Sequence, residues 1–132
     1  MEDFVKRMLD GSGINPPEAC LQAFAANFEG AVNIEWWDRG SSFEAIFYRD
    51  NLEHIAIFDR TGLLIEYRQF LPAPYLPEAI KTDLEARGEI MNAVLRNKGN
   101  SIEYEAIIRD KDLNRFLILM TDLGKVTEER KL

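Results

Sequence analysis

The sequence predicts an α+β fold built from two tandem repeats, each a helix followed by four strands. We expect the strands to form one curved antiparallel eight-stranded sheet with both helices packed on one face. The segment FEAI at residues 43–46 returns as YEAI at residues 104–107. The segment PEA at residues 17–19 returns at residues 77–79, so each copy recurs after about 60 residues. The alternation of apolar and polar residues after each helical segment is typical of half-buried strands.

These repeats define the expected organisation of the chain. A length of 132 residues suits a single domain with its own core, spanning residues 1–132. Repeat one covers about residues 14–70 and repeat two about residues 77–130. A joint at residues 71–76 contains two prolines and ends before a third, so it should be stiff and extended.

The first helix should begin within Asn15-Pro16-Pro17-Glu18, because Asn15 can cap it, Pro16 suits the first turn and Glu18 favours the positive end of the helix dipole. Gly30 should end it. Asp50-Asn51 indicates a two-residue hairpin turn, which fixes the register of the strands on either side. The expected strands of repeat one lie near residues 31–38, 42–49, 52–59 and 63–70. The expected pairs are Arg49 with Leu52, Phe47 with His54, Ile46 with Ile55, Ala45 with Ala56 and Phe43 with Phe58.

Repeat two follows the same plan. Pro77 should start its helix and Gly88 should end it. A turn at Lys111-Asp112, equivalent to the first hairpin, would complete the match between the two copies. The expected strands lie near residues 90–97, 101–109, 113–120 and 125–130. The expected pairs are Tyr104 with Leu119, Ala106 with Leu117 and Ile107 with Phe116.

Strand alternation separates a face that packs against the helices, the helix face, from an opposite open face. The residues assigned to the helix face are Trp36, Phe43, Ala45, Phe47, Ala56, Phe58, Leu95, Tyr104, Ala106, Ile108, Leu117 and Leu119. The open face should carry Trp37, Ile46, Tyr48, Ile55, Ile57, Ile107, Phe116, Ile118 and Met120. Charged residues are mixed among them, namely Glu44, Glu53, Glu103, Glu105 and Arg109.

An open face this apolar is unusual for a sheet that serves only as a scaffold, and apolar patches commonly mark interaction sites. It could be covered by residues 1–13, by a second copy in a homodimer, or by a separate protein or peptide. An aromatic and aliphatic centre with a charged rim is typical of protein interfaces. The candidate binding residues are Trp37, Tyr48, Ile55, Ile57, Phe116 and Ile118.

Other functions find little support in the sequence. The net charge of −7 disfavours partners such as nucleic acid and anionic membrane surfaces. One histidine, His54, and one cysteine, Cys20, cannot form a zinc site, and we expect no metal, cofactor or catalytic residue. His54 should be a half-buried residue at the edge of the core, and Cys20 a buried thiol. Glu44 and Glu105 recur at equivalent positions, which could suggest a pair of carboxylates for acid–base catalysis. Both lie beside apolar residues on the open face, and this setting favours a structural role.

Several short segments resemble the PepSY-like family, which is related in fold to the β-lactamase inhibitor protein. The first helix ends in aromatic residues, Phe24 and Phe28. A tryptophan strand, an aromatic-Glu-Ala strand, a Phe-Asp-x-x-Gly turn and a Leu-Pro helix follow. In this chain they are VNIEW at 32–36, FEA at 43–45, FDRTG at 58–62 and LPEAI at 76–80. The resemblance covers roughly residues 16–130.

The resemblance implies a curved sheet whose concave open side grips a protein, with no catalytic residues. The chain would then be a non-enzymatic binding module for an unknown protein or peptide. A structural homodimer that buries the same face and a small-ligand carrier are the alternatives. Members of the family are usually exported in bacteria, which implies a periplasmic location if the chain comes from a longer precursor. It would be cytoplasmic if Met1 is the native start.

Overall fold

The structure is a computed structural model that describes residues 14–132 and confirms the α+β class. Its helices span Glu18–Asn27 (α2) and Glu78–Arg87 (α3), with a 3₁₀ turn at Ala73–Tyr75 (η1). The strands of the first repeat are β1 (Val32–Asp38), β2 (Ser42–Arg49), β3 (Leu52–Asp59) and β4 (Leu64–Phe70). Those of the second are β5 (Glu89–Asn97), β6 (Ile102–Arg109), β7 (Arg115–Thr121) and β8 (Val126–Lys131).

The strands pair in sequence order, from β1 to β8, in one eight-stranded sheet. By its internal contacts the chain divides into two compact units, residues 1–67 (unit 1) and 68–132 (unit 2). The boundary lies inside β4, close to the predicted end of repeat one. Within residues 14–132 each unit therefore contains one α-helix, and β4 is divided between the two units. The single-domain assignment itself stays a prediction.

The predicted register of the first hairpin is confirmed. Asp50 and Asn51 both adopt positive φ angles, 54° and 64°, which the twist of a two-residue hairpin requires. All five predicted pairs form between β2 and β3, from Phe43 opposite Phe58 to Arg49 opposite Leu52. Because side chains alternate along a strand, this register alone sorts β2 and β3 into a helix face and an open face.

The predicted register of the equivalent hairpin in unit 2 is wrong by one residue. Its connection is a five-residue loop, 110–114, in which the Asp110 N–H donates to the Asn114 carbonyl and the Leu113 N–H donates to the Asp110 carbonyl. Leu113 takes a positive φ of 66°. Tyr104 therefore lies opposite Met120, Ala106 opposite Ile118, Ile107 opposite Leu117 and Ile108 opposite Phe116. A shift of one residue moves every side chain of β7 to the other face.

The first strand of each repeat contains a bulge that the sequence analysis did not predict. In β1 the register shifts between Val32 and Glu35, and Asn33 has a φ of 54°. In β5 the register shifts between Ile90 and Asn92. A bulge places an extra residue on one strand and turns the chain locally, which can re-aim side chains at a sheet edge. The repeat therefore extends to this irregularity.

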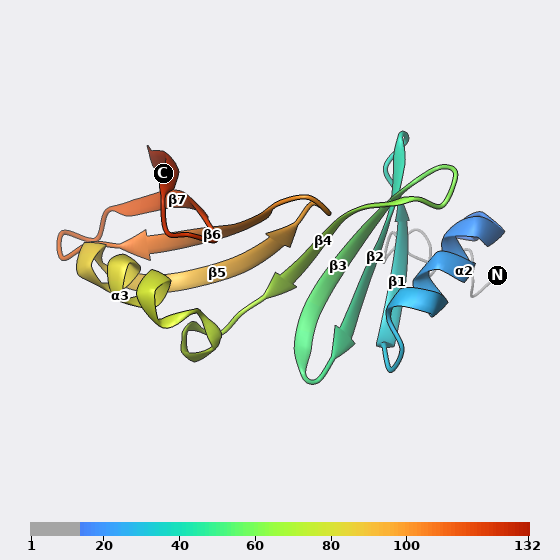
Figure 1. The fold of residues 1–132 in the computed structure, drawn as a ribbon, viewed down its shortest axis with the longest axis horizontal. Helices are drawn as coiled ribbons and strands as arrows, with labels where there is room; N and C mark the ends of the chain where they lie inside the picture. Colours follow the sequence, from blue (N-terminus) through green and yellow to red (C-terminus); the bar gives the residue numbers. More distant parts are fainter. Residues whose placement is uncertain (1–13) are drawn as a thin grey trace. The chain divides into compact units, whose positions relative to one another are not determined.

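Each unit has its own core on its helix face. In unit 1, Cys20 and Phe24 of α2 pack with Phe28 onto the strand residues Trp36, Phe43, Ala45, Phe47, Ala56 and Phe58. In unit 2, α3 lies against β5 and β6 (Figure 1), and Leu76, Ile80 and Leu84 pack on Ala93, Tyr104, Ala106, Ile108, Ile118 and Met120. Ten-residue helices are marginal alone, so this burial holds them in place.

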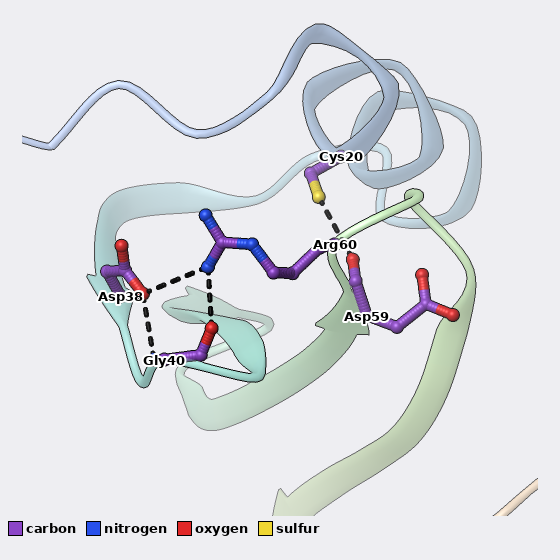
Figure 2. Close-up of polar contacts among 5 residues, drawn as sticks. All are labelled: Cys20, Asp38, Gly40, Asp59 and Arg60. Carbon is purple, nitrogen blue, oxygen red and sulfur yellow. Dashed lines mark hydrogen bonds and ion pairs between the residues drawn. The ribbon is translucent and has the colours of Figure 1, made fainter.

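In unit 1, the loop 59–63 forms polar contacts with the turn between β1 and β2 and with helix α2. Figure 2 shows Arg60 reaching the turn between β1 and β2, where its Nη1 donates to the Gly40 carbonyl at 2.6 Å and lies 3.4 Å from Asp38 Oδ1. The Cys20 thiol donates to the Asp59 carbonyl at 3.5 Å. Helix α2 therefore meets the loop at close range.

Candidate functional site

The open face of unit 1 carries the aromatic and aliphatic side chains expected of an interaction surface. Its residues are Trp37, Ile46, Tyr48, Ile55 and Ile57, together with the carboxylates of Glu35, Glu44 and Glu53. Tyr48 is 42% exposed and the others of the apolar set are half-buried. On the same strands, Phe43, Ala45, Phe47, Ala56 and Phe58 are buried beneath α2. Four of the predicted binding residues, Trp37, Tyr48, Ile55 and Ile57, therefore share this surface.

A groove of about 540 Å³ lies at one end of this surface. It is lined by Asn33, Ile34, Glu35, Ile46, Tyr48 and Glu53. The first three residues belong to the β1 bulge, which is at the edge of the sheet, and the other three come from β2 and β3. Ile34 is 43% exposed because the bulge interrupts its regular alternation. The groove thus combines apolar walls with two carboxylates.

Trp37 lies at the other end of the open face, where a charged pair partly covers it. The Arg39 guanidinium lies 4.9 Å from the centre of the Trp37 ring, a cation–π arrangement. Arg39 Nε also contacts Glu44 Oε2 at 3.2 Å, and Glu44 is opposite Trp37 in the ladder. The indole N–H of Trp37 is buried and has no hydrogen-bond partner among residues 14–132.

Two residues predicted for the open face, Phe116 and Ile118, lie elsewhere. Ile118 is fully buried in the core beneath α3, and Phe116 packs against the same core. Their placement on the open face is wrong because the five-residue loop shifts β7 by one position. Met120, also assigned to the open face, is buried on the helix face too. Leu117 and Leu119 exchange places with them and pair with open-face positions.

Two apolar side chains on the open face of unit 2 are buried, whereas those on the open face of unit 1 are half-buried or exposed. Val94 and Leu117 of unit 2 are only 6% and 7% exposed. Leu117 lies between Ile107 on β6 and Arg130 on β8. The methylene stem of an arginine can cover a neighbouring aliphatic residue. We therefore place the candidate site in unit 1 alone.

His54 lies in the core and is more buried than predicted, at 2% exposed. Its ring stacks on Phe47 at 5.2 Å and on Tyr67 at 5.6 Å. Its Nε2 lies 3.2 Å from the Arg49 carbonyl, which can only accept, so Nε2 carries the proton. Nδ1 therefore accepts from the Tyr67 hydroxyl at 2.5 Å. Burial lowers the pKa of His54, so the imidazole stays neutral inside the protein.

Cys20 is buried on the same side of the sheet, as predicted. Burial is the main cause that raises the pKa of its thiol, and the nearby Asp59 carboxylate adds to the shift. A protonated, enclosed thiol is a poor nucleophile. The two side chains best suited to covalent or proton-transfer chemistry therefore face away from the groove. Among residues 14–132 no group of three His, Cys, Asp or Glu side chains could hold a metal ion.

The sequence analysis missed Asn33, Ile34 and Glu35 as parts of the site, since it treated β1 as a regular strand. Asn33 gave the one available signal, because asparagine tolerates a positive φ better than other non-glycine residues. A regular strand would have turned Ile34 toward the helix face, so the groove depends on the bulge.

No protein-family model matches the chain, and no curated protein sequence matches it. None of the helices described between residues 14 and 132 is long and apolar enough to cross a membrane.

Solved structures do share its fold. A BLIP-like protein of Bacteroides fragilis superposes with a TM-score of 0.78 at 18% identity, covering 93% of this chain and 91% of the other. A DUF2874 family protein of Bacteroides uniformis gives a TM-score of 0.79 at 15% identity, covering 89% and 90%. A predicted periplasmic protein of Bacteroides eggerthii gives 0.80 at 14% identity with the same coverage. At these identities the likeness concerns the fold, and the chain has the BLIP-like fold.

Proposed function

We propose that this chain is a non-enzymatic binding module that holds a segment of a partner protein or peptide on the open face of unit 1. The observation that carries the proposal is the groove beside Tyr48, which continues onto the apolar row of Ile46, Ile55 and Ile57. Tyrosine and tryptophan dominate the energetics of many protein interfaces, and Tyr48 and Trp37 lie at opposite ends of this row. Phe116 and Ile118, which face the core of unit 2, do not belong to the proposed surface.

The placement of the reactive side chains supports a function without catalysis. His54 is buried on the helix face with both ring nitrogens engaged, and Cys20 is buried under α2. The groove holds carboxylates, an amide, a phenol and aliphatic side chains. An ordinary hydrolytic or transfer site needs an activated nucleophile or a general base next to an oxyanion stabiliser, and this lining supplies no such combination.

Membership of the PepSY-like family and export from the cytoplasm are part of the same proposal. The motifs quoted for that family lie in corresponding elements: the tryptophan strand is β1, and the Phe-Asp-x-x-Gly turn joins β3 to β4. The Bacteroides eggerthii structure with the same fold is a predicted periplasmic protein. An exported binding module would meet its partner in the periplasm or at the cell surface.

The test is selection of binding peptides followed by variants of the surface. A random dodecapeptide library displayed on phage is panned against the intact protein, and the enriched peptides are titrated by calorimetry. We expect the double variant Tyr48→Ser/Ile55→Ser to bind them at least about tenfold more weakly, since buried aromatic anchors carry most of the interface energy. The control is Leu63→Ser/Tyr75→Ser, which removes exposed apolar side chains elsewhere (63% and 64% exposed). If the selected peptides bound Tyr48→Ser/Ile55→Ser as tightly as the unchanged protein, the proposal would be contradicted.

Sedimentation velocity separates the proposal from its alternatives. A homodimer that buries the open face would become a monomer in Tyr48→Ser/Ile55→Ser, and the free chain would not select peptides on that face. A monomer that binds the peptides supports the module. A small-ligand carrier would hold a small molecule from the host extract in the groove through purification, which mass spectrometry of the denatured protein would detect.

A further inference from the structure

We infer that the groove at the β1 bulge receives an arginine side chain of the partner, with Glu35 and Glu53 as its counterions. This inference rests on the proposed function, because it names the chemistry by which the same surface recognises its partner. It concerns one subsite of about 540 Å³, lined by side chains of β1, β2 and β3.

Within the described part of the chain, the two carboxylates of the groove have no ion-pair partner. Three other carboxylates of the sheet have a cation nearby: Glu44 pairs with Arg39, Glu89 with Arg109, and Glu103 with Lys98. Neither Glu35 nor Glu53 forms an ion pair with any residue between 14 and 132. Of the residues from 14 to 132 that line the groove, none is a lysine, arginine or histidine. A guanidinium that enters the groove would therefore meet negative charge with no local cation to displace.

The walls of the groove suit the rest of an arginine side chain. Ile34 and Ile46 are aliphatic, and they can pack against the methylene stem while the charged end meets the carboxylates. The ring of Tyr48 offers a flat surface on which a planar guanidinium can stack. Arginine also donates several N–H groups in a fixed plane, so it can bind two carboxylates at once, as lysine cannot do with the same geometry.

The charge of the whole chain acts in the same direction. A net charge of −7 attracts cationic partners over a longer range, and it speeds their encounter more than it adds affinity. The affinity should come from the groove itself, where Glu53 is half-buried and its contact with a cation is less screened by salt.

The test uses matched small probes with the intact protein. N-acetyl-arginine amide and N-acetyl-citrulline amide have nearly the same shape, but only the first is charged. Each is titrated into the ¹⁵N-labelled protein, and the backbone amides of Asn33, Glu35, Tyr48 and Glu53 are followed. We expect dissociation in the millimolar range for the arginine probe, as for other fragments of its size. It should bind about tenfold more tightly than the citrulline probe, because a charge-assisted contact is stronger than a neutral one.

Variants decide whether the groove causes that preference. In Glu35→Gln/Glu53→Gln the arginine probe should lose its advantage over citrulline. In Glu29→Gln/Glu128→Gln, which removes two exposed carboxylates elsewhere, the advantage should remain. Equal binding of both probes, or an advantage that survives Glu35→Gln/Glu53→Gln, would overturn the inference.

The inference and the proposed function can fail separately. Peptides that bind the open face through Tyr48 but gain nothing from arginine would leave the binding module intact and remove its cationic subsite. Removal of residues 1–13, which contain Lys6 and Arg7, provides a further comparison. If that truncation alone made the arginine probe bind, the occupant of the groove would be this chain's own segment, and the assignment to a partner would be wrong.

Discussion

Gly62 offers the sharpest test of how helix α2 is seated in unit 1. It lies in the loop 59–63 with a φ of +93°, and a Cβ placed on it would lie 2.7 Å from the Ala19 Cβ and 2.8 Å from the Ala19 carbonyl carbon and oxygen. Two of these contacts are with backbone, which cannot move without shifting the helix. The substitution Gly62→Ala should therefore push α2 away from its loop.

The expected cost has two parts. A left-handed φ costs a non-glycine residue about 1–2 kcal/mol. Overpacking against a fixed neighbour adds about 1–3 kcal/mol. Gly40 provides the matched control, since it lies in the same unit with a φ of +89° and a Cβ there would meet nothing within 4 Å. Gly40→Ala should show the first part alone, so we expect the two variants to differ by about 1–3 kcal/mol.

Urea denaturation followed by tryptophan fluorescence measures this difference. Both tryptophans, Trp36 and Trp37, are in unit 1, so the signal reports the unit that carries the two glycines. The free energy of unfolding should fall more for Gly62→Ala than for Gly40→Ala, with the same dependence on urea concentration. Equal losses would mean that α2 does not contact the loop as the structure has it, and the reasoning would be refuted.

Three further predictions test other parts of the structure. Burial lowers the pKa of His54 below its ordinary value of 6.5, so on acidification the histidine of the unfolded chain takes up a proton before that of the folded chain. The contribution of His54 to the free energy of unfolding should therefore be fully present above pH 6.5 and decrease below it. Urea denaturation at about pH 7.5 and pH 5.5 should show this loss, and His54→Gln should remove it; an unchanged loss would contradict the assignment. Ile118→Ala should cost about 2–5 kcal/mol in thermal or chemical denaturation, and Ile107→Ala clearly less, because only Ile118 is fully buried; the reverse order would restore the register predicted from the sequence. Leu113→Gly should leave stability unchanged or raise it by up to about 1 kcal/mol, because Leu113 has a positive φ, whereas Leu123→Gly, without that φ, should lower it; equal losses would exclude strain at residue 113.

The repeat and the first hairpin could be predicted because their signals are local. Asp50-Asn51 is a pair of residues that accepts positive φ at both positions, and the alternation on either side has a single register that buries one face. The five predicted pairs of β2 and β3 followed directly. Four of the six proposed binding residues are therefore on the predicted surface.

The second hairpin could not be predicted in the same way. Leucine is an uncommon residue at positive φ, so nothing in the sequence marks Leu113 as the residue that closes a longer loop. Strand β7 is apolar on both faces from Phe116 to Met120, so alternation cannot reveal a slip of one residue. The hydrogen bonds of Asp110 with Leu113 and Asn114 close the longer loop that sets the register.

The groove depends on backbone geometry that the pattern of residues does not encode. The bulge in β1 adds one residue opposite β2 and brings Ile34 and Glu35 to the same edge. Sequence alternation assumes a regular strand, so it assigns neighbouring residues to opposite faces. The same limit applies to Arg39, whose position over Trp37 follows from the turn that joins β1 to β2.

The two tryptophans permit the most direct test of the central claim, because one lies on each face of unit 1. Trp36 is buried on the helix face, 5.6 Å from the Phe24 ring centre, and Trp37 is on the open face. The measurement is the ¹⁵N–¹H signal of each indole as a selected peptide is added. If the open face of unit 1 binds the partner, the Trp37 signal shifts with the occupancy of the peptide and the Trp36 signal stays in place. A shift of Trp36 alone, or of neither signal at saturation, would contradict the account.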